Sequence, residues 1–204
     1  MHIPDGFLDP VTSAATYALF LGYGLLAVRK ARIEKGESRH LVPVLAAGIF
    51  AAQMINWPLP GGTSLHFVGG ALAGILLGPW LGFLAMALVL LVQTLVFHDG
   101  GITALGANML NMAIIAVLAG YLVYRAFPAR LKALGAFAAG WLSVTLAGLA
   151  CGVELGLSSQ FLYGLGVAVP VMAGWHAALG IIEGAITAAV YSYLRQRAPA
   201  LLRG

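Results

Sequence analysis

Apolar runs separated by short polar segments make up nearly the whole chain. These runs cover residues 11–28, 41–58, 65–77, 79–97, 102–124, 133–153 and 161–194. A helix that crosses the hydrocarbon core of a bilayer, about 30 Å thick, needs roughly 20 apolar residues. The pattern therefore predicts an all-α integral membrane fold of about seven transmembrane helices.

The Gly78-Pro79 pair decides how many times the chain crosses the membrane. A single helix from Leu65 to Phe97 would be about 50 Å long at about 1.5 Å per residue. Gly-Pro is a turn signal, and we expect the chain to fold back at this point.

The charged residues provide an independent test of this topology. If the chain folds back, three basic segments fall on one side of the membrane: Arg29–Arg39, Arg125–Lys132 and Arg195–Arg203. Four acidic residues fall on the other side: Asp5, Asp9, Asp99 and Glu154. Because basic segments stay in the cytoplasm, we expect the N-terminus outside the cell and the C-terminus inside.

Composition supports a membrane protein without a water-exposed domain. Hydrophobic residues make up 61% of the chain and charged residues 9%, against about 25% charged in soluble domains. We expect one membrane domain in a prokaryotic inner membrane, with an N-terminal segment (1–10), a helical bundle (11–194) and a cytoplasmic tail (195–204). The net charge of +4 then reports orientation and not nucleic-acid binding.

The N-terminus carries the first candidate chemistry. No basic residue precedes the first apolar run, so a cleaved signal is not expected, and the large His2 favours retention of Met1. An unblocked Met1-His2 offers an amine, a backbone amide and an imidazole in adjacent chelate rings. The single cysteine, Cys151, rules out an internal disulfide and is expected to serve packing.

His66 is the candidate for a fourth ligand. Ten extended residues reach at most about 35 Å, and Pro4 with Asp5-Gly6 favours a reversal of the chain into the bundle. Four nitrogens in a plane suit Ni(II) or Cu(II) better than tetrahedral Zn(II). Two alternatives remain open: His2 is incidental, or His66 is only a hydrogen-bonded helix residue.

Several other polar residues fall in the apolar runs or beside them. Asn108 and Asn111 share one helix face, and with Gln93 they either support the metal ligands or bond between helices. In the outer loop, His98 and Asp99 either guide cations or are only solvated. His176 and Glu183, seven positions apart on the last helix, either neutralise one another or contact a partner.

Three segments resemble the substrate-binding components of nickel and cobalt energy-coupling factor transporters, the NikM/CbiM family. They are MHIPDGFLDP, NWPLPGGTSLHFVGGALAGILLGPW and VFHDGGITALGANMLNMA. The resemblance implies a metal site made by Met1, His2 and His66. The His-Ile-Pro-Asp-Gly opening is more similar to the nickel branch than to cobalt relatives.

The resemblance also implies partners. These are a transmembrane coupling subunit, two ATPase subunits and, as a further possibility, a small accessory membrane protein. Ala14 and Ala18 form a small-residue face on the first helix that either docks the coupling subunit or packs internally.

The expected function is uptake of Ni(II), with Co(II) as the alternative substrate, by a component that is not itself an enzyme. The chain lacks a nucleotide-binding Gly-x-x-x-x-Gly-Lys motif, a His-Glu-x-x-His motif and a Gly-x-Ser-x-Gly elbow. Two alternatives remain: cobalt uptake for cobalamin synthesis, and a stand-alone permease for divalent metals.

Overall fold

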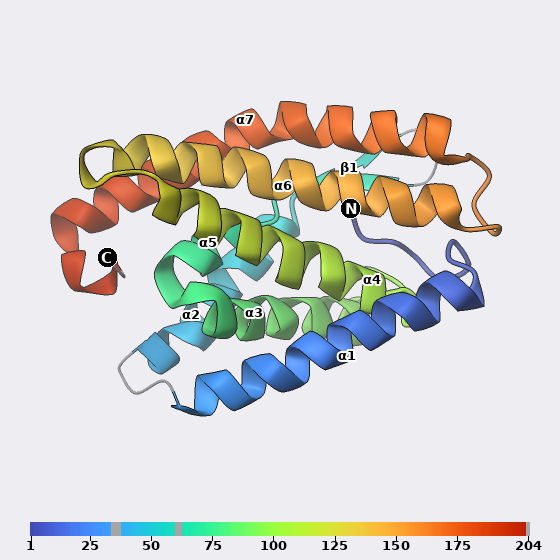
Figure 1. The fold of residues 1–204 in the computed structure, drawn as a ribbon, viewed down its shortest axis with the longest axis horizontal. Coiled ribbons are helices and arrows are strands. Elements are labelled where there is room, and N and C mark those ends of the chain that lie inside the picture. Colours follow the sequence, from blue (N-terminus) through green and yellow to red (C-terminus); the bar gives the residue numbers. More distant parts are fainter. Residues whose placement is uncertain (34–37, 60–62, 203–204) are drawn as a thin grey trace.

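The computed structural model describes residues 1–33, 38–59 and 63–202, and most of them are helical. Figure 1 shows long helices lying roughly side by side, with two short strands near the middle of the fold. The helices are α1 (Pro10–Ile33), α2 (Ser38–Gln53), α3 (Gly70–Val96), α4 (Leu105–Asn108), α5 (Ala116–Ala126), α6 (Lys132–Leu157) and α7 (Leu165–Arg197). A π-helical segment, η1 (Met109–Ile115), joins α4 to α5, and two 3-10 turns are η2 (Ala129–Leu131) and η3 (Pro199–Leu201).

Within the described ranges, five helices are long and apolar enough to cross a membrane. They are Pro10–Ile33, Gly70–Val96, Leu105–Ala126, Ala129–Leu157 and Leu165–Arg197. The chain is therefore a multi-pass membrane protein. Seven apolar runs do not give seven full-length helices, because α2 has only 16 residues and spans about 24 Å. The run from residue 65 to 77 contributes only the first part of α3, from Gly70 onward.

The predicted break at Gly78-Pro79 is confirmed. Gly78 has φ 73° and ψ −177°, a conformation outside the helical range that glycine adopts readily. The two halves of α3 pack against each other, because a Cβ added to Gly82 would lie 2.9 Å from the carbonyl oxygen of Ala73. In a straight helix these residues would be about 13.5 Å apart along the axis. The chain therefore reverses at Gly78.

The all-α prediction is wrong between α2 and α3, where the chain forms an antiparallel hairpin. Strand β1 (Asn56–Leu59) pairs with β2 (Thr63–His66), with Asn56 opposite His66. Pro58 cannot continue a helix, because it has no N–H to donate. Two apolar runs were expected to be helical throughout. The run 41–58 therefore ends in a strand, and the run 65–77 begins in one. Residues 60–62, between the two strands in the sequence, lie outside the described residues.

Basic residues collect at one end of the fold, as the charge pattern predicts. The last turn of α1 carries Lys30 and Arg32, the last turn of α5 carries Arg125, and the last turn of α7 carries Arg195 and Arg197. Figure 1 places these helix ends together at its left side, with the C-terminus, and the start of α1 at its right side. Residues 34–37 and 203–204 of the basic segments lie outside the described residues.

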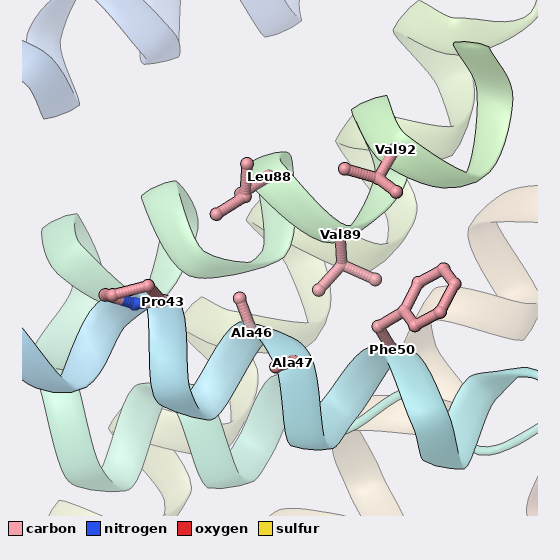
Figure 2. Close-up of a pocket in the computed structure, with 7 residues that line it drawn as sticks. All are labelled: Pro43, Ala46, Ala47, Phe50, Leu88, Val89 and Val92. Atoms are coloured by element: carbon pink, nitrogen blue, oxygen red, sulfur yellow. The ribbon is translucent and has the colours of Figure 1, made fainter. Parts of the chain in front are cut away.

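A groove of about 270 Å³ separates α2 from the second half of α3 (Figure 2). It is lined only by apolar side chains, namely Pro43, Ala46, Ala47, Phe50, Leu88, Val89 and Val92. A cation needs oxygen, nitrogen or sulfur ligands, so this groove is not a metal site.

Candidate metal site

The first three residues are inserted into the helical bundle. Met1, His2 and Ile3 are buried, and the N-terminus lies in the middle of the fold in Figure 1. The side chain of Asn108 holds Ile3 from both sides: Ile3 N donates to Asn108 Oδ1 over 2.8 Å, and Asn108 Nδ2 donates to Ile3 O over 3.1 Å. Gly101 N also donates to Ile3 O over 2.9 Å. The inserted segment is therefore held by directed hydrogen bonds.

A turn at Asp5 brings the chain back out of the bundle. Asp5 Oδ1 accepts hydrogen bonds from the nitrogen and hydroxyl of Thr103, at 2.7 and 2.6 Å, and these bonds lower the pKa of Asp5. Gly6 has φ 85°. Gly101 has to be glycine for this approach, because a Cβ would overlap the backbone of Asp5. The predicted reversal at Pro4 and Asp5-Gly6 is confirmed.

Asp9 connects the inserted segment to two helices. Its Oδ1 accepts from Thr12 N over 2.8 Å at the start of α1. Its Oδ2 accepts from Ser159 N, and its own nitrogen donates to Ser158 Oγ, both over 2.9 Å, just after α6. The ten N-terminal residues thus have anchors at Ile3, Asp5 and Asp9.

The rings of His2 and His66 stack on one another. Their centroids are 4.5 Å apart, and their planes differ by 14°. His2 reaches this place on the inserted segment, and His66 reaches it as the last residue of β2. The two histidines therefore meet, and His66 lies on a strand and not on a helix as one alternative expected.

Hydrogen bonds identify the nitrogen that each ring keeps available. His2 Nε2 lies 3.1 Å from Gln93 Oε1, and His66 Nδ1 lies 2.6 Å from the carbonyl oxygen of Phe67. Both oxygens only accept, so these nitrogens carry the protons. His2 Nδ1 and His66 Nε2 are left with lone pairs; His66 Nε2 is buried without a hydrogen-bond partner, and the polar neighbour of His2 Nδ1 is Asp99 Oδ1, 3.3 Å away. These are suitable atoms for binding a cation.

Burial keeps the nitrogen donors in their neutral, metal-binding forms. It lowers the pKa of the Met1 amine from 8.0 to about 5 and that of His2 from 6.5 to about 3. Burial also lowers the pKa of His66 well below 6.5, with smaller effects from the nearby amine and His2. At neutral pH the three groups therefore present lone pairs and no net positive charge.

Asp99 lies beside His2. One of the two alternatives from the sequence was that Asp99 is only solvated in an outer loop. Its Oδ1 lies 3.3 Å from His2 Nδ1, and its side chain is 24% exposed. Burial raises its pKa, and the nearby Met1 amine opposes this effect. Asp99 is therefore a partly exposed carboxylate in contact with the buried His2.

The other predicted polar residues have different surroundings. Asn111 Nδ2 donates to Glu154 Oε2 over 2.6 Å, which joins η1 to α6 and matches the alternative of bonding between helices. Cys151 Sγ lies 3.7 Å from the carbonyl oxygen of Met1, so it contacts the inserted segment as well as packing. The Asn111 contact joins two helical segments and the Cys151 contact joins α6 to the inserted segment, and no spacing in the sequence predicted these partners.

His176 and Glu183 do not neutralise one another. His176 Nδ1 lies 2.7 Å from the carbonyl oxygen of Met172, within α7. Glu183 instead accepts hydrogen bonds from the backbone nitrogens of Val68 and Gly69, just after His66. Glu183 is a residue of this region whose role the sequence did not indicate.

Ala14 and Ala18 are exposed on α1. Internal packing, the alternative for this pair, is therefore wrong. Only three residues of α1 are buried, Thr16, Ala27 and Ala31, so most of this apolar helix faces outward.

Among the described residues, no group of three or more His, Cys, Asp and Glu side chains is arranged to hold a metal ion. A zinc site with four side-chain ligands is therefore not found in residues 1–33, 38–59 and 63–202. A metal site at His2 and His66 has to use backbone or terminal nitrogens as well.

Known proteins resemble this chain along nearly its whole length. Residues 2–201 match the family model CbiM, described as the cobalt uptake substrate-specific transmembrane region. A protein of Archaeoglobus fulgidus, provisionally named a fused nickel transport protein NikMN, is 55% identical over 98% of this chain and 67% of its own length. A cobalt transport protein CbiM of Sorangium cellulosum is 32% identical over 99% of this chain and 94% of its own.

A solved structure shares the fold. The crystal structure of a truncated transition metal transporter has a TM-score of 0.89 and 36% sequence identity, and the match covers 97% of this chain and 99% of that one. The chain spans about two thirds of the fused nickel relatives, 67% of the Archaeoglobus protein and 64% of the fused nickel transport protein NikMN of Rhodobacter capsulatus. These relatives are metal transport proteins and not enzymes. The chain therefore belongs to the CbiM family and is a nickel or cobalt transport component of the NikM/CbiM type.

Proposed function

We propose that this protein captures Ni(II) outside the cell and serves as the substrate-binding membrane component of an ATP-driven energy-coupling factor importer. One observation supports this proposal above the others: the buried N-terminal segment stacks His2 on His66 at 4.5 Å. Met1, His2 and His66 are all buried, so the proposed nitrogen donors are shielded from water.

The proposed ligands are the Met1 amine, the deprotonated amide of His2, His2 Nδ1 and His66 Nε2. The amine and amide close a five-membered ring with the metal, and the amide and Nδ1 close a six-membered ring. Both imidazole nitrogens are the ones that hydrogen bonding leaves with lone pairs. Four nitrogens in one plane suit Ni(II), and a metal able to replace an amide proton at neutral pH is required.

Metal binding has to change the stacked arrangement of the two rings. A nitrogen ligand points its lone pair at the ion within the plane of its own ring. Two nearly parallel rings at 4.5 Å do not both point at one ion, so at least one ring rotates out of the stack on binding. We therefore expect Ni(II) to alter the environment of both histidines.

Gln93 and Asn108 support this ligand set. Gln93 fixes the proton of His2 on Nε2, and Asn108 holds the backbone of Ile3 directly after the chelating amide. Partners that orient ligands in this way typically change metal affinity about 10–100-fold. Asn111 is further from the ligands in this scheme and acts through Glu154.

The membrane orientation and the partners belong to the same proposal. The basic end of the fold faces the cytoplasm, so the N-terminal segment and Asp99 face outward. The exposed Ala14 and Ala18 face of α1 docks a transmembrane coupling subunit, which is tied to two ATPase subunits. The chain has no nucleotide-binding motif of its own, so these partners supply the energy for release.

Binding of Ni(II) and Co(II) to the purified full chain with an unblocked N-terminus tests the proposal. Isothermal titration should give one site with higher affinity for Ni(II), and an absorption spectrum typical of planar, low-spin Ni(II). A stronger response to Co(II) would favour the cobalt alternative, which the description of the matched family supports. Accumulation of metal in vesicles without ATPase subunits would favour a stand-alone permease. Absence of any binding would reject the proposal.

A further inference from the structure

The peptide group after His66 connects this histidine to a carboxylate on α7. His66 Nδ1 lies 2.6 Å from the carbonyl oxygen of Phe67. The nitrogen of that same peptide group, Val68 N, donates to Glu183 Oε2 over 2.9 Å. The imidazole, the Phe67–Val68 peptide and the carboxylate thus form one continuous chain of hydrogen bonds.

Two helices hold the backbone of this segment. Glu183 Oε1 accepts from Gly69 N over 2.8 Å, so both carboxylate oxygens bind backbone nitrogens. Gln53, the last residue of α2, donates from Nε2 to the carbonyl oxygen of Val68 over 2.6 Å. Glu183 and Gln53 are both buried, at 3% and 0% exposure, so water does not compete strongly for these bonds.

Glu183 also supplies the hydrogen-bond acceptor that the start of α3 lacks locally. Helix starts leave N–H groups without partners, and a local Ser, Thr, Asp or Asn usually accepts from them. Here the residue before α3 is Gly69, with φ 74° and no side chain. The acceptor comes instead from Glu183, and a carboxylate inside a membrane protein is expensive and commonly functional. The helix start favours its negative charge.

We propose that Glu183 is a positioning residue for metal binding, which orients the His66 ring and strengthens Nε2 as a donor through the Phe67–Val68 peptide. This inference rests on the proposed function. A carboxylate that accepts from Val68 N polarises the peptide, and Phe67 O then accepts more strongly from His66 Nδ1. Hydrogen bonds in a chain reinforce one another in this way. Such partners fix the tautomer of a histidine ligand and raise its basicity.

Gln53 provides an internal comparison. It binds the Val68–Gly69 peptide and not the Phe67–Val68 peptide, so it holds the same backbone without taking part in the chain that ends at His66. A purely mechanical role of the backbone would give Gln53 and Glu183 similar importance. The proposed polarisation gives Glu183 a separate effect on the electronic properties of the bound metal.

The test compares E183Q, E183D and Q53L with the wild-type full chain in detergent, each with an unmodified N-terminus. Nickel affinity is measured by titration, and ligand strength by the energy of the ligand-field absorption band. We expect E183Q to bind nickel about 10–100-fold more weakly, with its band at lower energy. E183D, which keeps the charge, should recover part of both properties. Q53L should weaken binding less and leave the band in place.

A folded E183Q protein with wild-type affinity and an unchanged band would overturn the inference. If E183Q does not fold, a measurement on the wild-type protein replaces it. Nickel loading should move the amide proton resonance of Val68 downfield, and an unmoved resonance would overturn the inference. The wild-type titration separates the two proposals. Wild-type protein that binds no nickel contradicts the proposed function, whereas wild-type binding with unaffected E183Q contradicts only the role of Glu183.

Discussion

His2 and His66, which lie far apart in the sequence, stack with their ring centroids 4.5 Å apart at the centre of the fold. His2 arrives on a segment without regular secondary structure, and His66 arrives on a strand. Neither position is fixed by a single long helix. The geometry therefore depends on the bonds that hold these two segments.

Extending the chain before Met1 should abolish tight nickel binding. An added Gly-Ser pair converts the terminal amine into an amide, and Met1 and Ile3 are at most 1% exposed, which leaves no room for extra residues. We expect at least about a 100-fold loss of affinity, because a ligand is removed and not only a supporting contact. Isothermal titration measures the effect. The same pair added after Gly204 is the control, and equal affinity of both extended proteins would contradict the ligand assignment.

His66→Ala should remove nickel binding, whereas His40→Ala should not. His66 is fully buried against His2, and His40 is an exposed residue near the start of α2. Loss of one of four ligands should lower affinity by at least about 100-fold. Equilibrium dialysis of both variants with nickel gives the comparison. Wild-type affinity in H66A would exclude this residue from the site.

Asn108→Ala should loosen the inserted segment. The substitution removes both hydrogen bonds to Ile3 and leaves the buried Ile3 N without its partner, whereas Ile3 O keeps the bond from Gly101 N. The expected loss is about 2–3 kcal/mol in the stability of the inserted state. Hydrogen exchange at Ile3 should accelerate accordingly. Asn111→Ala is the matched control, because Asn111 bonds Glu154 and not Ile3; similar exchange at Ile3 in both variants would contradict the role of Asn108.

The metal-free protein should become less stable as the pH falls from 8 to 5. The pKa of the Met1 amine is 8.0 when exposed and about 5 when buried, so the unfolded chain binds the extra proton in this window. Stability then decreases by about 1.4 kcal/mol per pH unit. Below pH 6.5 the decrease steepens, because His2, with its pKa lowered to about 3, remains neutral only when folded. Above pH 8 this contribution is constant.

Denaturant unfolding at a series of pH values measures this dependence. A protein acetylated at Met1 is the control, because it has no titratable amine. It should show little slope between pH 8 and 6.5. A wild-type protein whose stability is flat between pH 8 and 6.5 would show that the amine is not buried in the neutral form.

Ala18→Phe should impair assembly with the coupling subunit while leaving metal binding intact. Ala18 is exposed on α1, with Ala14 one turn away on the same face, so a bulky ring obstructs close approach of a second helix. The amount of coupling subunit that copurifies should fall about tenfold or more, because the interface depends on close contact between helices. Ala15→Phe, on a neighbouring face, is the control. Unchanged assembly of A18F would place the docking surface elsewhere.

The sequence predicted the features that follow from local chemistry. Apolar runs located the membrane helices, Gly78-Pro79 located the reversal, and Asp5-Gly6 located the turn that inserts the N-terminus. These features depend on hydrophobicity and on backbone conformations that proline and glycine favour. The β-hairpin was missed, because its residues also continue the hydrophobic runs of the helices on either side.

The supporting contacts of the site were largely beyond prediction. Asp99, Cys151 and Glu183 contact the ligand segments from distant parts of the chain, and their spacing has no pattern of its own. Helix faces could suggest Asn108 but could not assign Ile3 as its partner. Such pairs are set by how helices rotate and cross, which depends on the packing of the whole bundle.

The bond between Val68 and Glu183 joins residues 115 positions apart. During synthesis the ribosome adds about 5–20 residues per second, so the amides after His66 wait roughly 6–23 s for their acceptor. Until then, the nascent chain contains the histidines without the geometry that orders them. The backbone after His66 therefore gains this carboxylate only once the chain has been made as far as α7.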